Sequence, residues 1–120
     1  MKCHFCNPEE IIMSSKLSFA IYDKYPVNPG HMLIIPRRHV ADFFDLTFEE
    51  RADINDLLNQ CRNFLIEKHR PDGFNIGVNC GDAAGQTIFH VHVHLIPRYK
   101  GDIENPRGGV RGVIPEKRIY

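Results

Sequence analysis

The run His90-Val91-His92-Val93-His94-Leu95-Ile96 alternates imidazole side chains with branched apolar residues. Strict alternation of this kind is typical of a half-buried β-strand. Because successive side chains of a strand point to opposite faces, the three histidines would share one face while the apolar residues enter the core. Histidine is not a favoured strand residue, so three of them in two-residue steps indicate a face that binds metal or phosphate or transfers protons.

Length and composition predict one globular domain over residues 1–120. Fifteen basic and fifteen acidic residues cancel, which argues against the broad basic surface of a nucleic-acid or membrane-surface binder. No apolar run approaches the roughly 20 residues of a spanning helix, and the polar start lacks a signal-peptide core. We therefore expect a cytoplasmic protein with no nucleic-acid or membrane partner, whose four cysteines are reduced.

The order of predicted elements favours an α+β fold, with an antiparallel sheet and its helix on one face. Strand patterns cover residues 17–22, 31–35, 74–79 and 89–97. The clearest helix begins after Thr47, where Thr47-Phe48-Glu49-Glu50 is a capping box, and it ends near His69 because Pro71-Asp72-Gly73 is a strong stop. Residues 99–120 have little periodicity and predict an extended tail.

The three histidines allow two chemical interpretations. One is a catalytic metal held by all three, but alternate strand residues lie about 6.5–7 Å apart, and zinc needs ligand nitrogens about 2.0–2.1 Å from the ion. The other gives one imidazole a nucleophilic role, because the ordinary histidine pKa of about 6.5 leaves the free base populated near pH 7. Gly85-Gln86-Thr87 and Asn79 would then offer amide and hydroxyl donors to phosphate oxygens.

In these features the sequence resembles the histidine-triad (HIT) family of nucleotide hydrolases and transferases. The family signature alternates histidine with apolar residues and matches His90 to Ile96 without a mismatch. The resemblance covers most of the chain, and its further segments follow the family order: Leu17-Ser18-Phe19-Ala20, Pro29-Gly30-His31-Met32-Leu33-Ile34-Ile35-Pro36, Gly85-Gln86-Thr87 and Pro97-Arg98. It implies the HIT-like fold, with about five antiparallel strands, one long helix and a short helix packed on one face.

The resemblance also implies roles for individual residues. His92 would attack the α-phosphorus and form a nucleotidyl-histidine intermediate, with His94 on the phosphate or leaving-group side. The oxygens would be bound by the loop residues Asn79, Gly85, Gln86 and Thr87, with Gln86 also assisting catalysis. Asp23 falls where family members bind the ribose hydroxyls, with support of a turn before Pro26 as the alternative.

Some family members with an N-terminal C-x-x-C pair bind zinc. By resemblance, residues 1–10 would supply Cys3 and Cys6 to a site completed by His39 and His90. Four protein ligands would close the coordination sphere, so one zinc ion per chain would be structural. A lone C-x-x-C is a weak motif, and two free thiols are the alternative.

The resulting hypothesis is an enzyme that cleaves at the α-phosphate of a dinucleoside polyphosphate, a phosphoramidate or an acyl-nucleotide and releases a nucleoside monophosphate. Small branches of the family are usually homodimers, and the apolar tail residues would be less exposed against a second subunit. Two alternatives stay open: a nucleotide-binding interaction protein with incidental catalysis, and a metallohydrolase that uses all three histidines.

Overall fold

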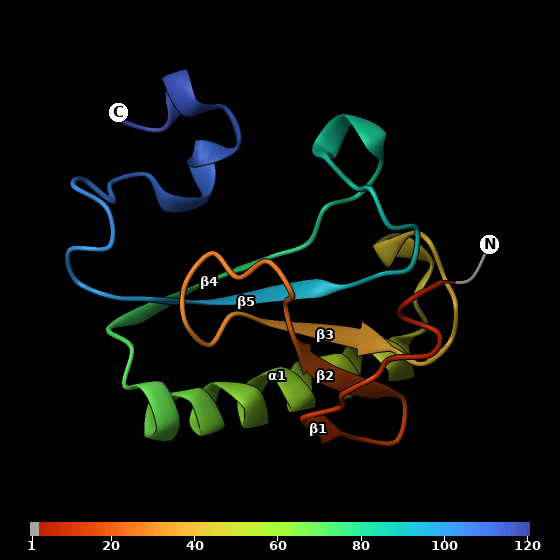
Figure 1. Cartoon of the computed structure of the whole chain (residues 1–120). Helices are drawn as coiled ribbons and strands as arrows, with labels where there is room; N and C mark the ends of the chain where they lie inside the picture. Colours follow the sequence, from red (N-terminus) through yellow and green to blue (C-terminus); the bar gives the residue numbers. More distant parts are fainter. Residues whose placement is uncertain (1–2) are drawn as a thin grey trace.

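The computed structural model describes residues 3–120, so the first two residues of the expected metal-binding segment 1–10 lie outside it. One sheet contains five strands in the order β1-β2-β3-β5-β4, and every neighbouring pair is antiparallel (Figure 1). The strands are β1 (Met13–Ser14), β2 (Ser18–Tyr22), β3 (Met32–Pro36), β4 (Gly73–Gly77) and β5 (Val93–Arg98). The α+β prediction is confirmed, and the short edge strand β1 is an addition to it.

The long helix α1 (Phe48–His69) has both of its predicted ends. The Thr47 hydroxyl accepts from the Glu50 amide at 3.0 Å, and the Glu50 carboxylate accepts from the Thr47 amide at 2.9 Å. Both bonds satisfy amide groups that the first helical turn leaves without a partner. At the other end Arg70 adopts a left-handed conformation with φ 51° and donates its amide hydrogen to Ile66. The chain then turns directly into β4.

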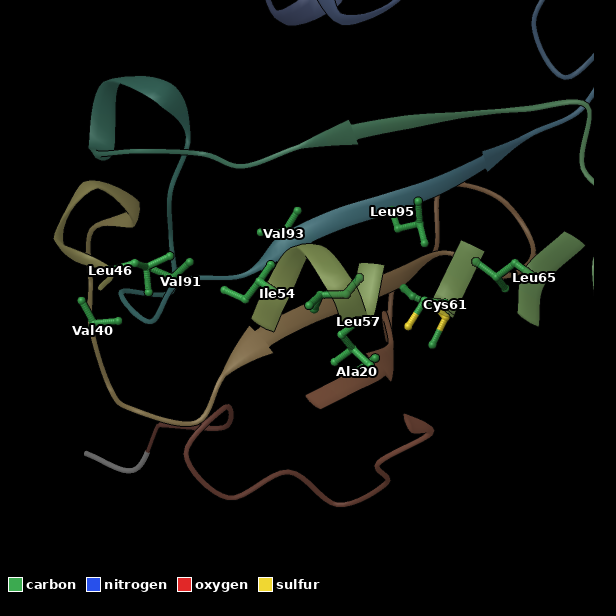
Figure 2. Packing of buried hydrophobic residues seen from close by; sticks show 12 residues of the cluster. Ala20, Val40, Leu46, Ile54, Leu57, Cys61, Leu65, Val91, Val93 and Leu95 are labelled. Atoms are coloured by element: carbon green, nitrogen blue, oxygen red, sulfur yellow. The ribbon is translucent and has the colours of Figure 1, made fainter. Parts of the chain in front are cut away.

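Helix α1 covers one face of the sheet and forms the main core there (Figure 2). Its buried stripe comprises Ile54, Leu57, Cys61 and Leu65. These side chains pack with strand residues that point to the same side, including Ala20, Ile34, Val93 and Leu95. Burial raises the pKa of the Cys61 thiol to about 11. Cys61 is therefore a small core residue, as its place on the helical stripe predicts.

The histidine run is only partly a strand, and its predicted start at residue 89 is wrong. β5 begins at Val93, and its ladder with β3 pairs Val93, His94 and Leu95 with three β3 residues. Residues 88–92 do not pair with β3. In this segment the Val91 amide donates instead to the Val40 carbonyl at 2.8 Å. Val91 still enters the main core. The alternation therefore predicts the burial of Val91, Val93 and Leu95 correctly, but it predicts neither the full burial of His90 nor the strand pairing.

The remaining helical elements are short 3-10 turns: η1 (Phe43–Asp45), η2 (Asp82–Ala84), η3 (Gly109–Val113) and η4 (Pro115–Lys117). The last two lie in the tail, which was expected to be extended but instead folds back on itself (Figure 1). The Arg118 guanidinium donates to the carbonyls of Asn105 and Arg107 and closes this loop. Among residues 3–120, no helix combines the length and the apolar character needed to cross a membrane.

Candidate active site

A cavity of about 650 Å³ lies on the sheet face opposite α1. Ile21 and Leu33 form part of its wall, because they alternate with the strand residues that face the helix. His92 and His94 also line it. The other predicted substrate-binding residues in its wall are Asp23, Asn79, Gly85 and Thr87. The fold therefore brings together residues from β2, the histidine run and the loop before it.

The hydrogen bond of His92 determines which ring nitrogen is available for chemistry. His92 Nδ1 lies 2.8 Å from the carbonyl oxygen of His90. A carbonyl can only accept, so in the neutral ring Nδ1 carries the proton. The lone pair is then on Nε2, and the side chain is half-buried in the wall of the cavity. This tautomer suits a nitrogen nucleophile.

His94 has the opposite tautomer, because a buried histidine fixes it. The Val27 amide donates to His31 Nδ1 at 3.0 Å, which leaves the proton of a neutral His31 on Nε2. His31 Nε2 lies 2.9 Å from His94 Nδ1 and donates to it. His94 therefore carries its own proton on Nε2. Two neighbouring imidazoles in the cavity wall thus present a lone pair and a hydrogen-bond donor.

Asp23 has two contacts, and they bear on both of its proposed roles. Its Oδ1 accepts from the Tyr25 amide at 2.9 Å, which is the turn-supporting contact. Its Oδ2 lies 3.4 Å from His31 Nε2 and 4.0 Å from His94 Nδ1. The carboxylate therefore supports the turn and also lies beside the histidine pair in the cavity wall. Binding of ribose hydroxyls stays a prediction.

Burial lowers the pKa values of His31 and His94 below the ordinary histidine value. For His94, the neighbouring His31 and His92 rings lower the pKa further, while the Asp23 carboxylate opposes the shift in both histidines. Because the charged forms are disfavoured, both rings are neutral near pH 7. The hydrogen-bond chain from Val27 through His31 to His94 is then intact at that pH.

We predict that lowering the pH from about 7 to about 5 decreases the free energy of unfolding of the metal-free protein. His31, His90 and His94 have lowered pKa values in the folded chain, whereas the unfolded chain takes up protons near the ordinary value of about 6.5. Their contribution is therefore full above that value and is lost as the pH falls through the folded-state pKa values. Urea unfolding at several pH values measures it. A constant midpoint between these pH values would contradict the assignment.

Gln86 differs from its predicted position in the substrate site. Its side chain is only 5% exposed, and it points away from the cavity towards backbone groups of neighbouring segments. Its Oε1 accepts from the Gly81 amide at 2.8 Å, and its Nε2 donates to the carbonyls of Ala41 and Ile88 at 2.7 and 3.2 Å. Because the side-chain amide of Gln86 is hydrogen-bonded to these backbone groups, it supports the loop and does not line the cavity in this structure. A part for Gln86 in catalysis stays a prediction.

Cys3, Cys6, His39 and His90 come together as the resemblance implies, with ligand atoms within 4.8 Å of one another. His90 Nε2 donates to the Pro36 carbonyl at 2.7 Å, so its Nδ1 lone pair faces the sulfurs. That nitrogen lies 3.5 Å from each Sγ. A tetrahedral zinc ion with bonds of about 2.3 Å to sulfur and 2.0 Å to nitrogen separates such atoms by about 3.5 Å. The donor set therefore fits zinc.

A second group, formed by Asp23, His31 and His94, also lies within 4.8 Å but does not fit a metal. His31 Nδ1 already accepts from the Val27 amide, so a neutral ring has no lone pair on Nε2 for an ion. Within residues 3–120, neither candidate group includes His92, and His90 and His94 belong to different groups. The arrangement does not fit the hypothesis of one catalytic metal held by all three triad histidines.

His31 and Phe5 belong to the site although neither was assigned to it from the sequence. His31 fixes the His94 tautomer, and the ring centroids of Phe5 and His92 lie 5.0 Å apart. The pairing of β3 with β5 places Leu33 opposite His94, so His31 shares that face two residues away. A correct strand pairing would have been the signal for His31.

The architecture and the histidine pair define a small α+β domain with a histidine-based site on the open face of its sheet. The chain belongs to the HIT domain family, whose pattern matches residues 5–101. The HIT-like fold expected from the sequence is thereby confirmed.

Two curated relatives and one solved structure illustrate the similarity. AP-4-A phosphorylase of Mycobacterium tuberculosis is 38% identical over 93 residues, covering 77% of this chain and 48% of the relative. Bis(5'-adenosyl)-triphosphatase of Dictyostelium discoideum is 42% identical over 96 residues, covering 80% and 64%. A zinc-bound histidine triad family protein from Mycobacterium smegmatis superposes with TM-score 0.76 at 33% identity, covering 86% of this chain and 79% of that one. The chain thus spans about half to two thirds of the curated relatives.

Proposed function

We propose that this chain is a nucleotide hydrolase or transferase that cleaves at the α-phosphate of a nucleoside 5'-phosphoryl substrate through a nucleotidyl-His92 intermediate. The observation that carries the proposal is the pair of opposite tautomers, with a lone pair on His92 Nε2 and a proton on His94 Nε2. The names of the two relatives favour dinucleoside polyphosphates over phosphoramidates and acyl-nucleotides as substrates. The cavity is large enough for a ligand of nucleotide size.

In the proposed reaction the His92 Nε2 lone pair attacks the α-phosphorus, and the bond from phosphorus to the leaving oxygen breaks. The electron pair leaves with that oxygen, and His94 Nε2 donates a hydrogen bond to the developing charge. The phosphorylated His92 ring is cationic, and its Nδ1 proton still points at the His90 carbonyl. Water then attacks phosphorus, the phosphorus–nitrogen bond breaks, one water proton passes to solvent, and a nucleoside monophosphate leaves.

A trapping experiment with substrates labelled at the α-phosphate tests this proposal. Diadenosine triphosphate, diadenosine tetraphosphate and an adenosine phosphoramidate are mixed with enzyme, quenched in alkaline detergent and analysed by mass spectrometry. The expected result is a burst of product equal to the sites present, with the adduct located on His92. A nucleotide-binding interaction protein would bind these compounds with neither burst nor adduct, and that result would overturn the proposal.

We further propose that Cys3, Cys6, His39 and His90 bind one structural zinc ion per chain. Four protein ligands leave no position for a reacting water, so bound zinc supplies a cross-link and no Lewis-acid chemistry. The fit of the sulfur and nitrogen positions supports the proposal. A solved histidine triad family protein from M. smegmatis is zinc-bound, which supports metal binding by a chain of this family.

We predict that a Cys3→Ala/Cys6→Ala double variant loses its zinc. Removing both sulfur donors leaves two imidazoles, so the zinc content should fall from about one per chain to near zero. Atomic emission after dialysis measures the content. Cys80→Ala is the matched control, because Cys80 is a half-buried cysteine outside the metal group. Zinc that stayed in the double variant would show a different site.

The expected homodimer also remains a proposal. The folded tail leaves several apolar residues exposed: Val110, Val113, Ile114, Ile119 and Tyr120. A second copy of the chain would cover apolar surface of this kind. Light scattering on the purified protein measures the mass.

A further inference from the structure

The N-terminal segment carries one aromatic side chain, Phe5, between the two sulfur donors of the metal group. The Cys6 amide donates to the Cys3 carbonyl at 3.1 Å, so the chain turns tightly around Phe5. Phe5 is 6% exposed and packs with Phe19, Leu33 and Ile35 in a second apolar cluster on the cavity face of the sheet. The position of Phe5 therefore depends on the turn that holds the two thiols.

Phe5 contacts both halves of the histidine run. The centroid of its ring lies 6.1 Å from the centroid of the His90 ring, at an interplanar angle of 88°. The same centroid lies 5.0 Å from the centroid of the His92 ring, and the Phe5 side chain forms part of the cavity wall. One side chain therefore touches a metal-group imidazole, the proposed nucleophile and the space that a nucleotide would fill.

Residues 3–11 have few other attachments to the domain. Among the described residues, the hydrogen bonds that join this segment to the rest come from the two thiols, to His39 and His90. The next attachment is the Ile12 amide, which donates to the Ala20 carbonyl. Without a metal, thiol contacts and the burial of Phe5 must hold the segment against its conformational entropy.

We propose that Phe5 couples metal binding to nucleotide binding. Zinc at the four-residue group fixes the turn and hence Phe5 against His92, so nucleotide binding no longer has to order this wall. The coupling is reciprocal by thermodynamic linkage, and nucleotide raises zinc affinity by the same factor. Phe5 is thus a positioning residue that acts through the cavity wall and His92. The inference rests on the nucleotide and zinc sites proposed above.

The first measurement compares the zinc-loaded and metal-free full-length chain. Calorimetric titration with 5'-AMP should give at least about fivefold tighter binding to the loaded protein, the lower end of usual coupling factors. Competition with a chromophoric chelator should give a zinc affinity that rises by the same factor when AMP is saturating. Equal AMP affinities with and without zinc would overturn the coupling while leaving the nucleotide site and its chemistry standing.

Two matched variants test whether Phe5 carries the effect. Phe5→Leu shortens the side chain at the wall, and Phe64→Leu makes the same change at a half-buried phenylalanine that packs on the main core and does not line the cavity. The AMP affinity ratio should fall towards one in Phe5→Leu, with zinc still at one per chain, and should stay near the wild-type value in Phe64→Leu. An unchanged ratio in Phe5→Leu would overturn the assignment to Phe5. Loss of all zinc or all AMP binding in the wild-type chain would overturn the inference together with the corresponding proposed site.

Discussion

Replacing His92 with alanine should lower the turnover of a dinucleoside polyphosphate by about 10⁴-fold or more, as removal of a nucleophile does in other enzymes. The reason is specific to one atom: the lone pair of His92 Nε2 is available because Nδ1 donates to the His90 carbonyl. Nucleotide affinity should change little, because Asp23, Thr87 and His94 still line the cavity. Initial rates, together with calorimetric titration of AMP, measure the two effects separately.

The control for this experiment is another histidine in the same cavity. His4 also lines the cavity, but it is exposed and lies outside the histidine run. His4→Ala should therefore keep turnover within about tenfold of wild type, because it provides no covalent step. If His92→Ala retained turnover at the level of His4→Ala, the covalent mechanism would have to be abandoned.

The second large effect is expected at His31. His31→Leu removes the Nε2 proton that His94 Nδ1 accepts. Asp23 Oδ2, 4.0 Å from His94 Nδ1, would then favour the proton on Nδ1, and an Nε2 lone pair would face the phosphate in place of a donor. A wrong tautomer in a catalytic histidine is worth up to about 10⁴ in turnover elsewhere, so we expect a loss of about 10²–10⁴-fold, mainly in kcat.

A conservative variant separates this effect from simple loss of packing. His31 is 2% exposed, so the leucine variant also leaves the Val27 amide without its acceptor. His31→Gln keeps an amide donor for His94 Nδ1 and should recover a large part of the activity. Nitrogen chemical shifts should report a proton on Nε2 of His94 in wild type and in the glutamine variant, and on Nδ1 in the leucine variant. An unchanged His94 tautomer in the leucine variant would refute the role of His31.

Elements with local signals were predictable from the sequence. The ends of α1 follow from the Thr47 cap and the Pro71-Asp72-Gly73 stop, because capping and turn chemistry act within a few residues. The start of β5 was not predictable in this way. The amide of Val91 pairs with Val40, about fifty positions away, and no periodicity within the run reports such a partner. The two residues of β1 are too short for any pattern.

The same division applies to the site. The family resemblance predicts the group of Cys3, Cys6, His39 and His90, and the fold brings their ligand atoms together. Gln86 turned away because Ala41 and Gly81 lie behind its loop, a fact of tertiary packing that the loop sequence does not contain. The tautomer of His94 likewise depends on a contact between segments that are distant in the sequence.

The carbonyl of His90 gives the nucleophile a degree of protection against mutation. This group belongs to the peptide backbone, so any residue at position 90 that preserved the local chain path would still accept from His92 Nδ1. Exchange of the His90 side chain removes the bond to Pro36 and one nitrogen of the metal group, but not the partner of His92. The side chains of the metal group can therefore change in a protein with this fold while the hydrogen bond that orients the His92 imidazole is kept.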